Sequence, residues 1–220
     1  MEKNVLIVNY NTTLLTQCCI KSINKFTPGC KIYVFDNSDK EFFVNIFDNV
    51  KVFNNTNSGI IDFNKWLSGI KTKVPNGYQS AKHCYSIQKS IDIIDDNIVL
   101  LDSDVLLKKD ITDLFDENYI YVGDSEKYKG VERVIPYCCF INVNECKKQG
   151  ITYYNEQYML ALTPNNVYDT GAYFYMRCKD FPHKRINYND YVVHLDNGSF
   201  WYDNKKRQEI FLSNNKHLWC

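Results

Sequence analysis

The sequence predicts an α/β protein whose sheet is mixed, mostly parallel and flanked by helices. Short apolar runs at residues 5–8, 32–35 and 98–101 each end in Asn or Asp. Runs of this kind are typical of strands that are buried on both faces of a sheet. A segment with helical spacing of apolar residues lies between the first two runs. Because strands and helices alternate, we expect crossover connections and a binding edge at the carboxyl ends of the strands.

Composition and charge exclude several classes of protein. The chain has 220 residues, of which 45% are apolar and 15% aromatic, so it can bury a large core. Its 26 basic and 26 acidic residues balance, which removes any general attraction to nucleic acid. The nine cysteines form no Cys-x-x-Cys, so neither a zinc module nor a disulfide framework is indicated. The apolar run at 5–8 is too short for a signal segment, so we expect a cytoplasmic protein with reduced, mostly buried thiols.

The first half of the chain predicts a βαβ unit followed by a further strand. After the strand at 5–8, Thr12 or Thr13 can cap a helix with apolar residues at helical spacing. Strands at 31–35 and 50–53 follow. These strands end in loops rich in Asn and Asp, and in a parallel sheet those ends lie along one edge.

A second long helix is expected after a Pro-Asn-Gly break. Ser80 can cap this helix, which then runs to Ile94. Lys82 and His83 would lie in its first turns, beside the strand that ends at Asp102. A helix N-terminus with such donors is a candidate diphosphate contact, although a lone His is more often a surface or packed residue.

Asp102-Ser103-Asp104 follows the apolar run at 98–101 and is the first candidate for chemistry. Two carboxylates separated by one residue can both turn toward a hard divalent cation, which prefers oxygen ligands and often shares them with substrate phosphates. The alternative is a turn with an N-cap, a common use of Asp after a strand. The residues alone leave both interpretations open.

The second half predicts fewer regular elements. A short helix is expected over 108–115, with strands over 119–123, 134–142 and 191–194. Pro136 predicts that the strand over 134–142 lies at an edge or bends, because proline cannot donate to a sheet ladder.

Three segments, taken in order, resemble the family 2-like glycosyltransferases of the GT-A fold. They are Val5-Leu6-Ile7-Val8-Asn9-Tyr10-Asn11, Ile32-Tyr33-Val34-Phe35-Asp36-Asn37-Ser38 and Leu100-Leu101-Asp102-Ser103-Asp104. The resemblance covers the first half of the chain well and the second half loosely. It implies a Rossmann-like GT-A domain that moves a sugar from a nucleotide-diphosphate sugar to a saccharide, glycolipid or related hydroxyl acceptor.

The resemblance also implies nucleotide contacts. Asn9, Asn11 and Asp36 match the positions that hold the nucleoside in that family, and Asp36 would accept hydrogen bonds from a base NH group. The Asn57-Ser58-Gly59 segment resembles the family's Asn/Gly loop before the helix that contacts the sugar nucleotide.

A metal site follows from the same resemblance. Asp102 and Asp104 match the family's Asp-x-Asp pair, which binds Mn²⁺ or Mg²⁺ between the two phosphates. Asp104 is expected at an exposed strand end as the better ligand, while Asp102, next to Ser103, contacts the ribose or the metal through water. His194 and the following turn with Ser199 resemble a third metal ligand or phosphate contact. The alternative for His194 is a half-buried residue at a strand end.

Asp169 lies where inverting enzymes of this family keep the catalytic base, which removes a proton from the acceptor hydroxyl. The family's Glu-Asp pair is absent, because Tyr168 precedes Asp169. The base and the stereochemical outcome therefore both stay open. A turn-initiating Asp before Gly171 is the alternative.

Two other functions compete with glycosyl transfer. A nucleotidyltransferase also binds nucleotide and metal on an α/β edge, but it usually needs a loop rich in Gly and basic residues after the first strand, and residues 9–12 offer none. A non-catalytic, carbohydrate-binding module with a transferase-like fold is the second alternative. Dinucleotide and P-loop sites lack their glycine motifs here.

We expect one GT-A-like domain over 1–220. Its predicted parts are a nucleotide-sugar-binding half over 1–107, an acceptor-side half over 108–204 and a C-terminal tail over 205–220. The tail is basic at its start and carries three large apolar residues, which predicts either peripheral membrane contact or a solvated, partly packed segment. These apolar residues are Phe211, Leu212 and Trp219.

Overall fold

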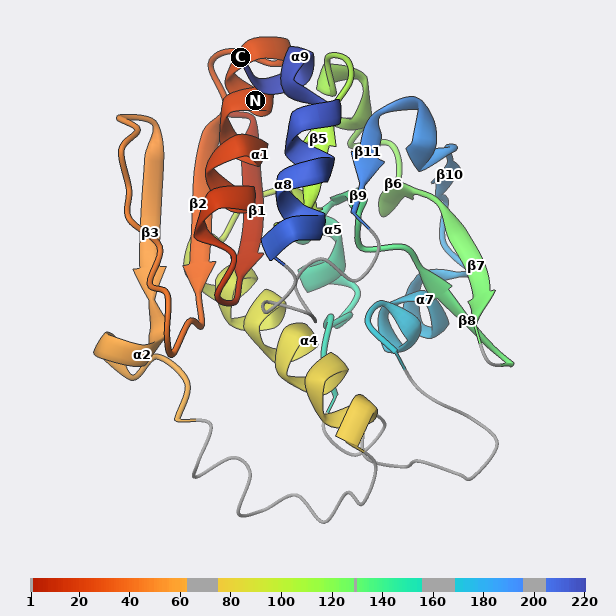
Figure 1. Cartoon of the computed structure of the whole chain (residues 1–220). Helices are drawn as coiled ribbons and strands as arrows, with labels where there is room; N and C mark the ends of the chain where they lie inside the picture. The colour runs from red at the N-terminus through yellow and green to blue at the C-terminus, as the bar shows by residue number, and fades with distance from the viewer. Residues whose placement is uncertain (1, 63–74, 129, 156–168, 196–204) are drawn as a thin grey trace.

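The computed structural model describes residues 2–62, 75–128, 130–155, 169–195 and 205–220 (Figure 1). Its strands are β1 Asn4–Asn9, β2 Lys31–Asp36, β3 Val50–Asn54, β4 Ile98–Asp102, β5 Val105–Leu107, β6 Tyr121–Gly123, β7 Ser125–Tyr128, β8 Val131–Val134, β9 Cys138–Ile141, β10 Lys184–Arg185 and β11 Val192–His194. Its α-helices are α1 Thr13–Phe26, α2 Asn55–Ser58, α4 Pro75–Ile94, α5 Val143–Lys148, α7 Ala172–Cys178, α8 Lys205–Asn214 and α9 Lys216–Trp219. Two 3₁₀ turns, η1 Thr112–Leu114 and η2 Tyr188–Asp190, complete the described elements.

The central sheet has the order β10-β6-β9-β4-β1-β2-β3. Strands β1, β2, β3 and β4 are parallel, and β9 runs antiparallel to both β4 and β6. Two small antiparallel sheets, β5 with β11 and β7 with β8, flank it. The predicted class, an α/β protein with a mixed and mostly parallel sheet, is confirmed.

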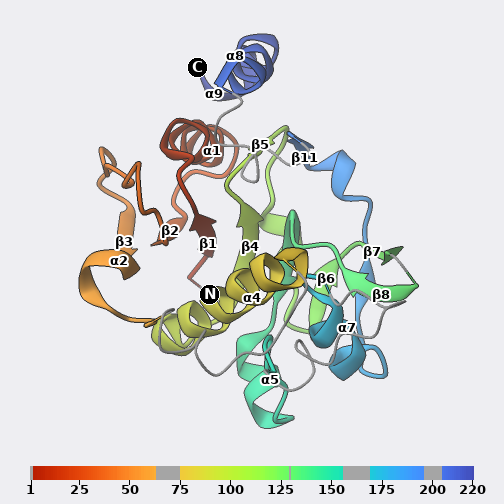
Figure 2. The same cartoon turned by 60° about the horizontal axis from the view of Figure 1, so that its bottom comes forward.

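Helices cover both faces of the sheet, with α1 on one side and α4 on the other (Figure 2). Alternate residues of β1 serve the two faces: Leu6 packs in the core cluster that includes Ile87 of α4, and Ile7 packs with Ile20 of α1. Because both sides of the strand are buried, every position gains from an apolar side chain. This is why the central strands read as continuous apolar runs.

Helix α4 begins earlier than the sequence predicts. It starts at Pro75, a residue that suits the first turn of a helix because its missing N–H needs no partner there. Ser80 is therefore not a cap, and Lys82 and His83 lie inside the helix. Lys82 and His83 therefore do not lie at the helix N-terminus, and their role as diphosphate contacts stays a prediction.

The predicted strand over 134–142 is two strands. Residues 131–134 form β8, which pairs with β7 in a hairpin that the sequence does not predict, and residues 138–141 form β9. Pro136 lies in the connection between them, as the bend alternative requires. The edge alternative is wrong, because β9 lies between β4 and β6 inside the sheet.

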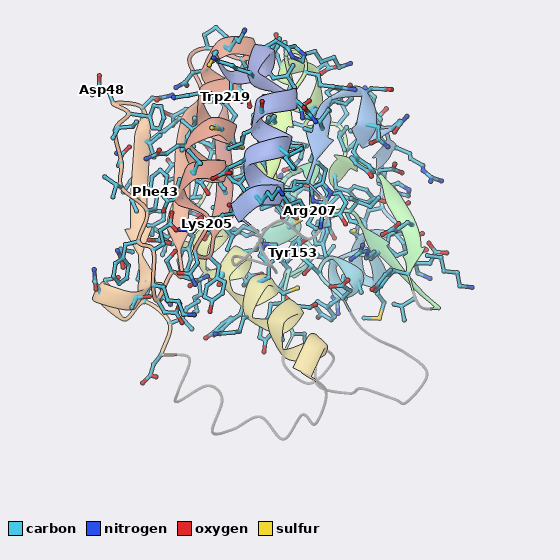
Figure 3. All side chains as sticks on the ribbon, in the orientation of Figure 1. Phe43, Asp48, Tyr153, Lys205, Arg207 and Trp219 are labelled. Carbon is cyan, nitrogen blue, oxygen red and sulfur yellow. The ribbon has the colours of Figure 1, made fainter. Side chains whose placement is uncertain are left out.

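The C-terminal residues form helices α8 and α9 outside α1 (Figure 1). Leu212 is buried in a cluster with Leu15 and Leu106, and Phe211 and Trp219 pack against the same cluster. In Figure 3, Trp219 lies near one end of this pair of helices, and Lys205 and Arg207 lie near the other end. The three apolar side chains on which the membrane prediction depends are thus used in packing. No helix within the described residues is long and apolar enough to span a bilayer.

The cysteines agree with the sequence prediction. All nine are free thiols, and eight are buried, whereas Cys220 is exposed. The eight buried thiols act as small apolar side chains of the core.

Candidate functional site at the carboxyl edge of the sheet

Strand register brings the polar strand ends together. In the parallel pairs, Asp102 lies opposite Val8, Asn9 lies opposite Asp36, and Asp36 lies opposite Asn54. The carboxyl ends of β4, β1, β2 and β3 therefore form one edge, as expected for a binding crevice in an open α/β sheet.

Asp102, Asp104 and His194 form a cluster at this edge. One ligand atom from each residue lies within 4.8 Å of the others. The His194 side chain reaches the pair because β11 runs antiparallel to β5, with His194 opposite Val105. His194 Nε2 lies 3.3 Å from Asp104 Oδ1, and the Leu195 amide donates to the Asp104 carbonyl at 3.0 Å.

The donor set of this cluster suits a divalent cation. Asp102 Oδ1 is buried and accepts no hydrogen bond from any residue that the structure describes, an arrangement that costs free energy unless a cation or another donor is present. Burial raises the pKa of Asp102; the nearby His83 opposes this shift, and Asp104 adds to it. The two carboxylates are the oxygen ligands that Mg²⁺ and Mn²⁺ prefer, and the imidazole adds a nitrogen ligand of the kind that transition metals accept more readily than Mg²⁺.

The two carboxylates differ from the sequence prediction in their exposure. The Asp104 side chain is 2% exposed and that of Asp102 is 17% exposed, so the expected exposed strand end at Asp104 is wrong. The reason is β11, which pairs with β5 and covers Asp104. Asp102 is the more accessible of the two.

Asn9 and Asp36 are bound to each other rather than presented to a ligand. Asn9 Nδ2 donates to Asp36 Oδ1 at 2.8 Å, and Asn9 Oδ1 accepts from Thr12 and Thr16. Asp36 also accepts from the Ser38 hydroxyl and amide and from an amide of the next loop. Both side chains are fully buried. This saturation disfavours the predicted contact between Asp36 and a base NH group.

Asn11 organises the loop that follows β2. It has φ of 55°, a left-handed conformation that Asn tolerates better than most residues. Its Oδ1 accepts the backbone amides of Asp39, Lys40 and Glu41, and its Nδ2 donates to Asp39 Oδ1 at 2.7 Å. The loops after β1 and β2 are therefore one hydrogen-bonded unit. Asp39 at its surface also accepts from the Tyr10 hydroxyl at 3.3 Å.

The other predicted nucleotide contacts are spread along the same edge. Ser103 is buried, and its hydroxyl lies 3.1 Å from that of Thr12. Asn57 is exposed on α2, which Gly59 ends in a left-handed conformation with φ of 63°. Lys82 is half-buried on α4; burial lowers its pKa, and the charge of Asp39 opposes that shift. Ser199 lies outside the described residues.

His83 faces the metal candidates although it does not lie at a helix end. Its Nε2 lies 3.8 Å from Asp102 Oδ1, and its Nδ1 lies 3.5 Å from the Thr170 hydroxyl. His83 thereby links the carboxylate cluster to the turn that carries Asp169.

Asp169 is held by three donors from different parts of the chain. Arg133 Nη1 donates to Oδ2 at 2.5 Å, Ser80 Oγ donates to Oδ1 at 2.6 Å, and the Thr170 amide donates to Oδ1 at 2.7 Å. An ion-paired carboxylate gives up a charge-assisted bond when it accepts a proton. The observed pairing therefore disfavours the predicted role of Asp169 as catalytic base.

Sequence reasoning missed Arg133 and Tyr137. The Arg133 side chain is 8% exposed, and the Tyr137 ring stacks on His194 with centroids 3.8 Å apart. The short β7–β8 hairpin carries few apolar residues, so no periodic signal marks it. The charged pair Glu132-Arg133 between Val131 and Val134 is the only local indication in the sequence.

Comparison with solved structures identifies the fold. The galactosyltransferase LgtC, in complex with donor and acceptor sugar analogs, matches with a TM-score of 0.51 and 11% identity over 84% of this chain and 73% of that chain. The apo form of the glycosyltransferase GlyE from Streptococcus pneumoniae TIGR4 matches with a TM-score of 0.53 and 14% identity. This chain has the GT-A glycosyltransferase fold. No protein-family model and no curated protein matches the sequence.

The GT-A fold accounts for most of the described chain. The match to GlyE covers 86% of this chain but 46% of that protein, so this chain spans about half the length of GlyE. At these identities the likeness establishes the fold. The chemistry has to be argued from the residues at the edge.

Proposed function

We propose that this chain is a divalent-metal-dependent glycosyltransferase that moves a sugar from a nucleotide-diphosphate sugar to a saccharide, glycolipid or related hydroxyl acceptor. The observation that carries the proposal is the cluster of Asp102, Asp104 and His194 at the carboxyl edge of a GT-A sheet. LgtC and GlyE, whose fold this chain shares, are glycosyltransferases, which supports the proposal.

Asp102, Asp104 and His194 would hold the cation, Mn²⁺ or Mg²⁺. Such a cation acts as a Lewis acid that stabilises the charge of a diphosphate leaving group. The buried, hydrogen-bond-poor Asp102 Oδ1 gives the cation a preorganised ligand. His83 at 3.8 Å from Asp102 is the neighbouring donor for an anionic oxygen.

The nucleoside would lie over the loops after β1, β2 and β3. Asn9, Asn11 and Asp36 support this surface from below by bonding the two loops together. Lys82 supplies a partly desolvated ammonium beside it, which suits a diphosphate. Asn57, on α2, and Gly59, which ends α2, would lie on the β3 side of this surface.

The acceptor hydroxyl would lie on the side of Asp169, in the half over 108–204. Three of the approximately four acceptor positions of a carboxylate are used at Asp169, which leaves one on Oδ2 for a substrate hydroxyl. We propose that Asp169 binds a hydroxyl in this way and does not act as a free base.

Isothermal titration with UDP, GDP and ADP, each with Mn²⁺, Mg²⁺ or EDTA, tests the donor site directly. We expect one nucleotide to bind in the presence of a metal and to lose most of its affinity with EDTA. Absence of binding to all three nucleotides in every condition would reject the proposal.

Hydrolysis of the corresponding sugar nucleotides without acceptor separates an enzyme from a carbohydrate-binding module. Metal-dependent release of the nucleotide diphosphate supports transfer chemistry. Release of a nucleoside monophosphate would instead show that the bond between the two phosphates is cleaved. A nucleotidyltransferase acts on that bond, so this result would favour the nucleotidyltransferase alternative.

A further inference from the structure

Arg133 is the most enclosed cation near the candidate site among the described residues, and the proposed function gives it no role. Its guanidinium group lies between two carboxylates: Nη1 bonds Asp169, while Nε and Nη2 bond Glu126 Oε1 at 2.9 and 2.5 Å. Its Cζ also lies 4.6 Å from the ring centre of Tyr128. A planar guanidinium suits this arrangement because its donors point in fixed directions.

The backbone fixes Arg133 against the turn that carries Asp169. Glu126 and Arg133 are directly paired across the β7–β8 hairpin. The next residue, Val134, donates its amide to the Gly171 carbonyl at 3.3 Å. A Cβ atom on Gly171 would lie 2.1 Å from the Val134 carbonyl oxygen, so the hairpin and the turn are in closest contact at this point.

Arg133 also lies near the metal candidates from the other side. Burial raises the pKa of the Tyr137 hydroxyl, the positive charge of Arg133 opposes this shift, and the Tyr137 ring stacks on His194. On the first side, Asp169 is followed by Thr170, whose hydroxyl faces His83, and His83 faces Asp102. A series of contacts therefore joins Arg133 to Asp102 through the turn, and Tyr137 lies between the Arg133 side and His194.

We propose that Arg133 is a positioning residue that fixes Asp169, and with it the turn that faces His83, at the sugar-transfer site. This inference rests on the proposed function and adds to it a residue outside the metal cluster. Without the guanidinium, Asp169 and Glu126 would face each other as like charges with no cation between them. The turn that carries Asp169 would then move, and its groups must keep their place for transfer.

The first experiment measures the metal-dependent turnover of UDP-, GDP- and ADP-hexoses by Arg133→Gln and by two control variants. Arg133→Gln should lower kcat about 100-fold with a smaller change in donor KM, because misplaced groups affect the reacting state most. Guanidinium chloride below denaturing concentrations should restore part of the kcat, which a merely unfolded variant would not recover.

Two controls separate positioning from hairpin stability. Glu126→Gln removes the negative charge of the hairpin partner of Arg133 but keeps the bond to Asp169, so it should retain most of the turnover. Arg185→Gln removes an exposed arginine that bonds Asp124 and the Ser125 carbonyl beside the same hairpin, and it should leave turnover unchanged. An equal loss in Glu126→Gln and Arg133→Gln, or no rescue by guanidinium, would overturn the inference.

A second measurement needs no substrate. Urea unfolding gives the free energy of unfolding of Arg133→Gln, of Asp169→Asn and of the double variant. If the two residues interact, the double variant loses less of this free energy than the two single variants lose together. Additive losses would refute the pairing. If the wild type turns over none of the donors, the proposed function fails, and this comparison still decides whether Arg133 fixes Asp169.

Discussion

His194 Nε2 lies 3.3 Å from Asp104 Oδ1, and the two side chains are 6% and 2% exposed. The contact depends on β11, which returns late in the chain to pair with β5. Strand pairing therefore brings His194 to the Asp-x-Asp pair and completes the candidate metal cluster. The imidazole of His194 is held in turn by the stacked ring of Tyr137.

Removal of either residue should weaken metal binding without unfolding the chain. For Asp104→Ala and His194→Ala we expect Mn²⁺ affinity to fall at least about 10-fold, the scale reached by changes around metal ligands. Titration calorimetry or the electron paramagnetic resonance signal of free Mn²⁺ measures this. Asp180→Ala and His217→Ala remove exposed residues of the same types and serve as matched controls. Unchanged Mn²⁺ affinity in the folded His194 variant would contradict the assignment.

Asp169→Asn should separate transfer from donor binding. The amide keeps the shape but weakens the bonds to Arg133 and Ser80, so the substrate hydroxyl loses an oriented, charged acceptor. We expect turnover to fall about 100-fold while nucleotide affinity, measured by calorimetry, stays within about twofold. A parallel loss of nucleotide affinity would place Asp169 on the donor side instead.

Asp36 should matter for stability more than for nucleotide contact. Asp36→Asn turns an amide donor toward groups that are themselves donors, in a fully buried position. The expected loss is about 3 kcal/mol in the free energy of unfolding. Urea denaturation measures it. Asp39→Asn, at an exposed position of the same loop, is the control and should change stability little. Equal stability of the two variants would contradict the buried network.

Gly171 is needed both for its conformation and for space. It has φ of +86°, and an added Cβ would meet the Val134 carbonyl oxygen at 2.1 Å. Gly29 has φ of +85° but open space around it, so Gly29→Ala measures the conformational strain alone, about 1 kcal/mol. Gly171→Ala should lose clearly more, as measured by thermal unfolding. Equal losses would mean that the hairpin and the turn separate easily.

The buried thiols predict lower stability in alkali. Burial raises the pKa of Cys18 and of Cys30 from 9.0 to about 11. Above pH 9 the unfolded chain loses these protons while the folded chain keeps them, so the free energy of unfolding falls as pH rises toward about 11. Urea midpoints on both sides of pH 9 measure the slope. Cys30→Ala should reduce the slope, whereas Cys220→Ala, at an exposed position, should leave it unchanged.

The central strands could be predicted from the sequence because burial on both faces requires a continuous run of apolar residues, which is visible locally. Val5 to Val8 and Ile98 to Leu101 are apolar throughout, since helices cover both sides of the sheet. The β7–β8 hairpin has no continuous apolar run, because β7 is polar and mostly half-buried. The start of α4 was misplaced because Ser80, a good capping residue, bonds Asp169 from within the helix instead.

The composition of the site could be predicted better than its geometry. Two features of the sequence predict the metal candidates: the short Asp-x-Asp motif, and the order of segments that resembles a known family. Both features identify which residue types stand at the strand ends. Their exposure depends on which later segment covers them, and β11 covers Asp104. In the same way, Asp36 is a strand-end acid by sequence, yet its partners come from three places in the fold. Such partners are set by tertiary contacts that no local pattern encodes.

The place of β1 in the sheet also has a consequence for how the chain is made. Leu6 lies opposite Tyr33 of β2 on one side and opposite Leu100 of β4 on the other. During synthesis the first strand can pair on one side early, but its second side stays open until β4 has been made. We therefore expect a nascent chain that exposes one of its most apolar segments for much of translation and that folds late and slowly.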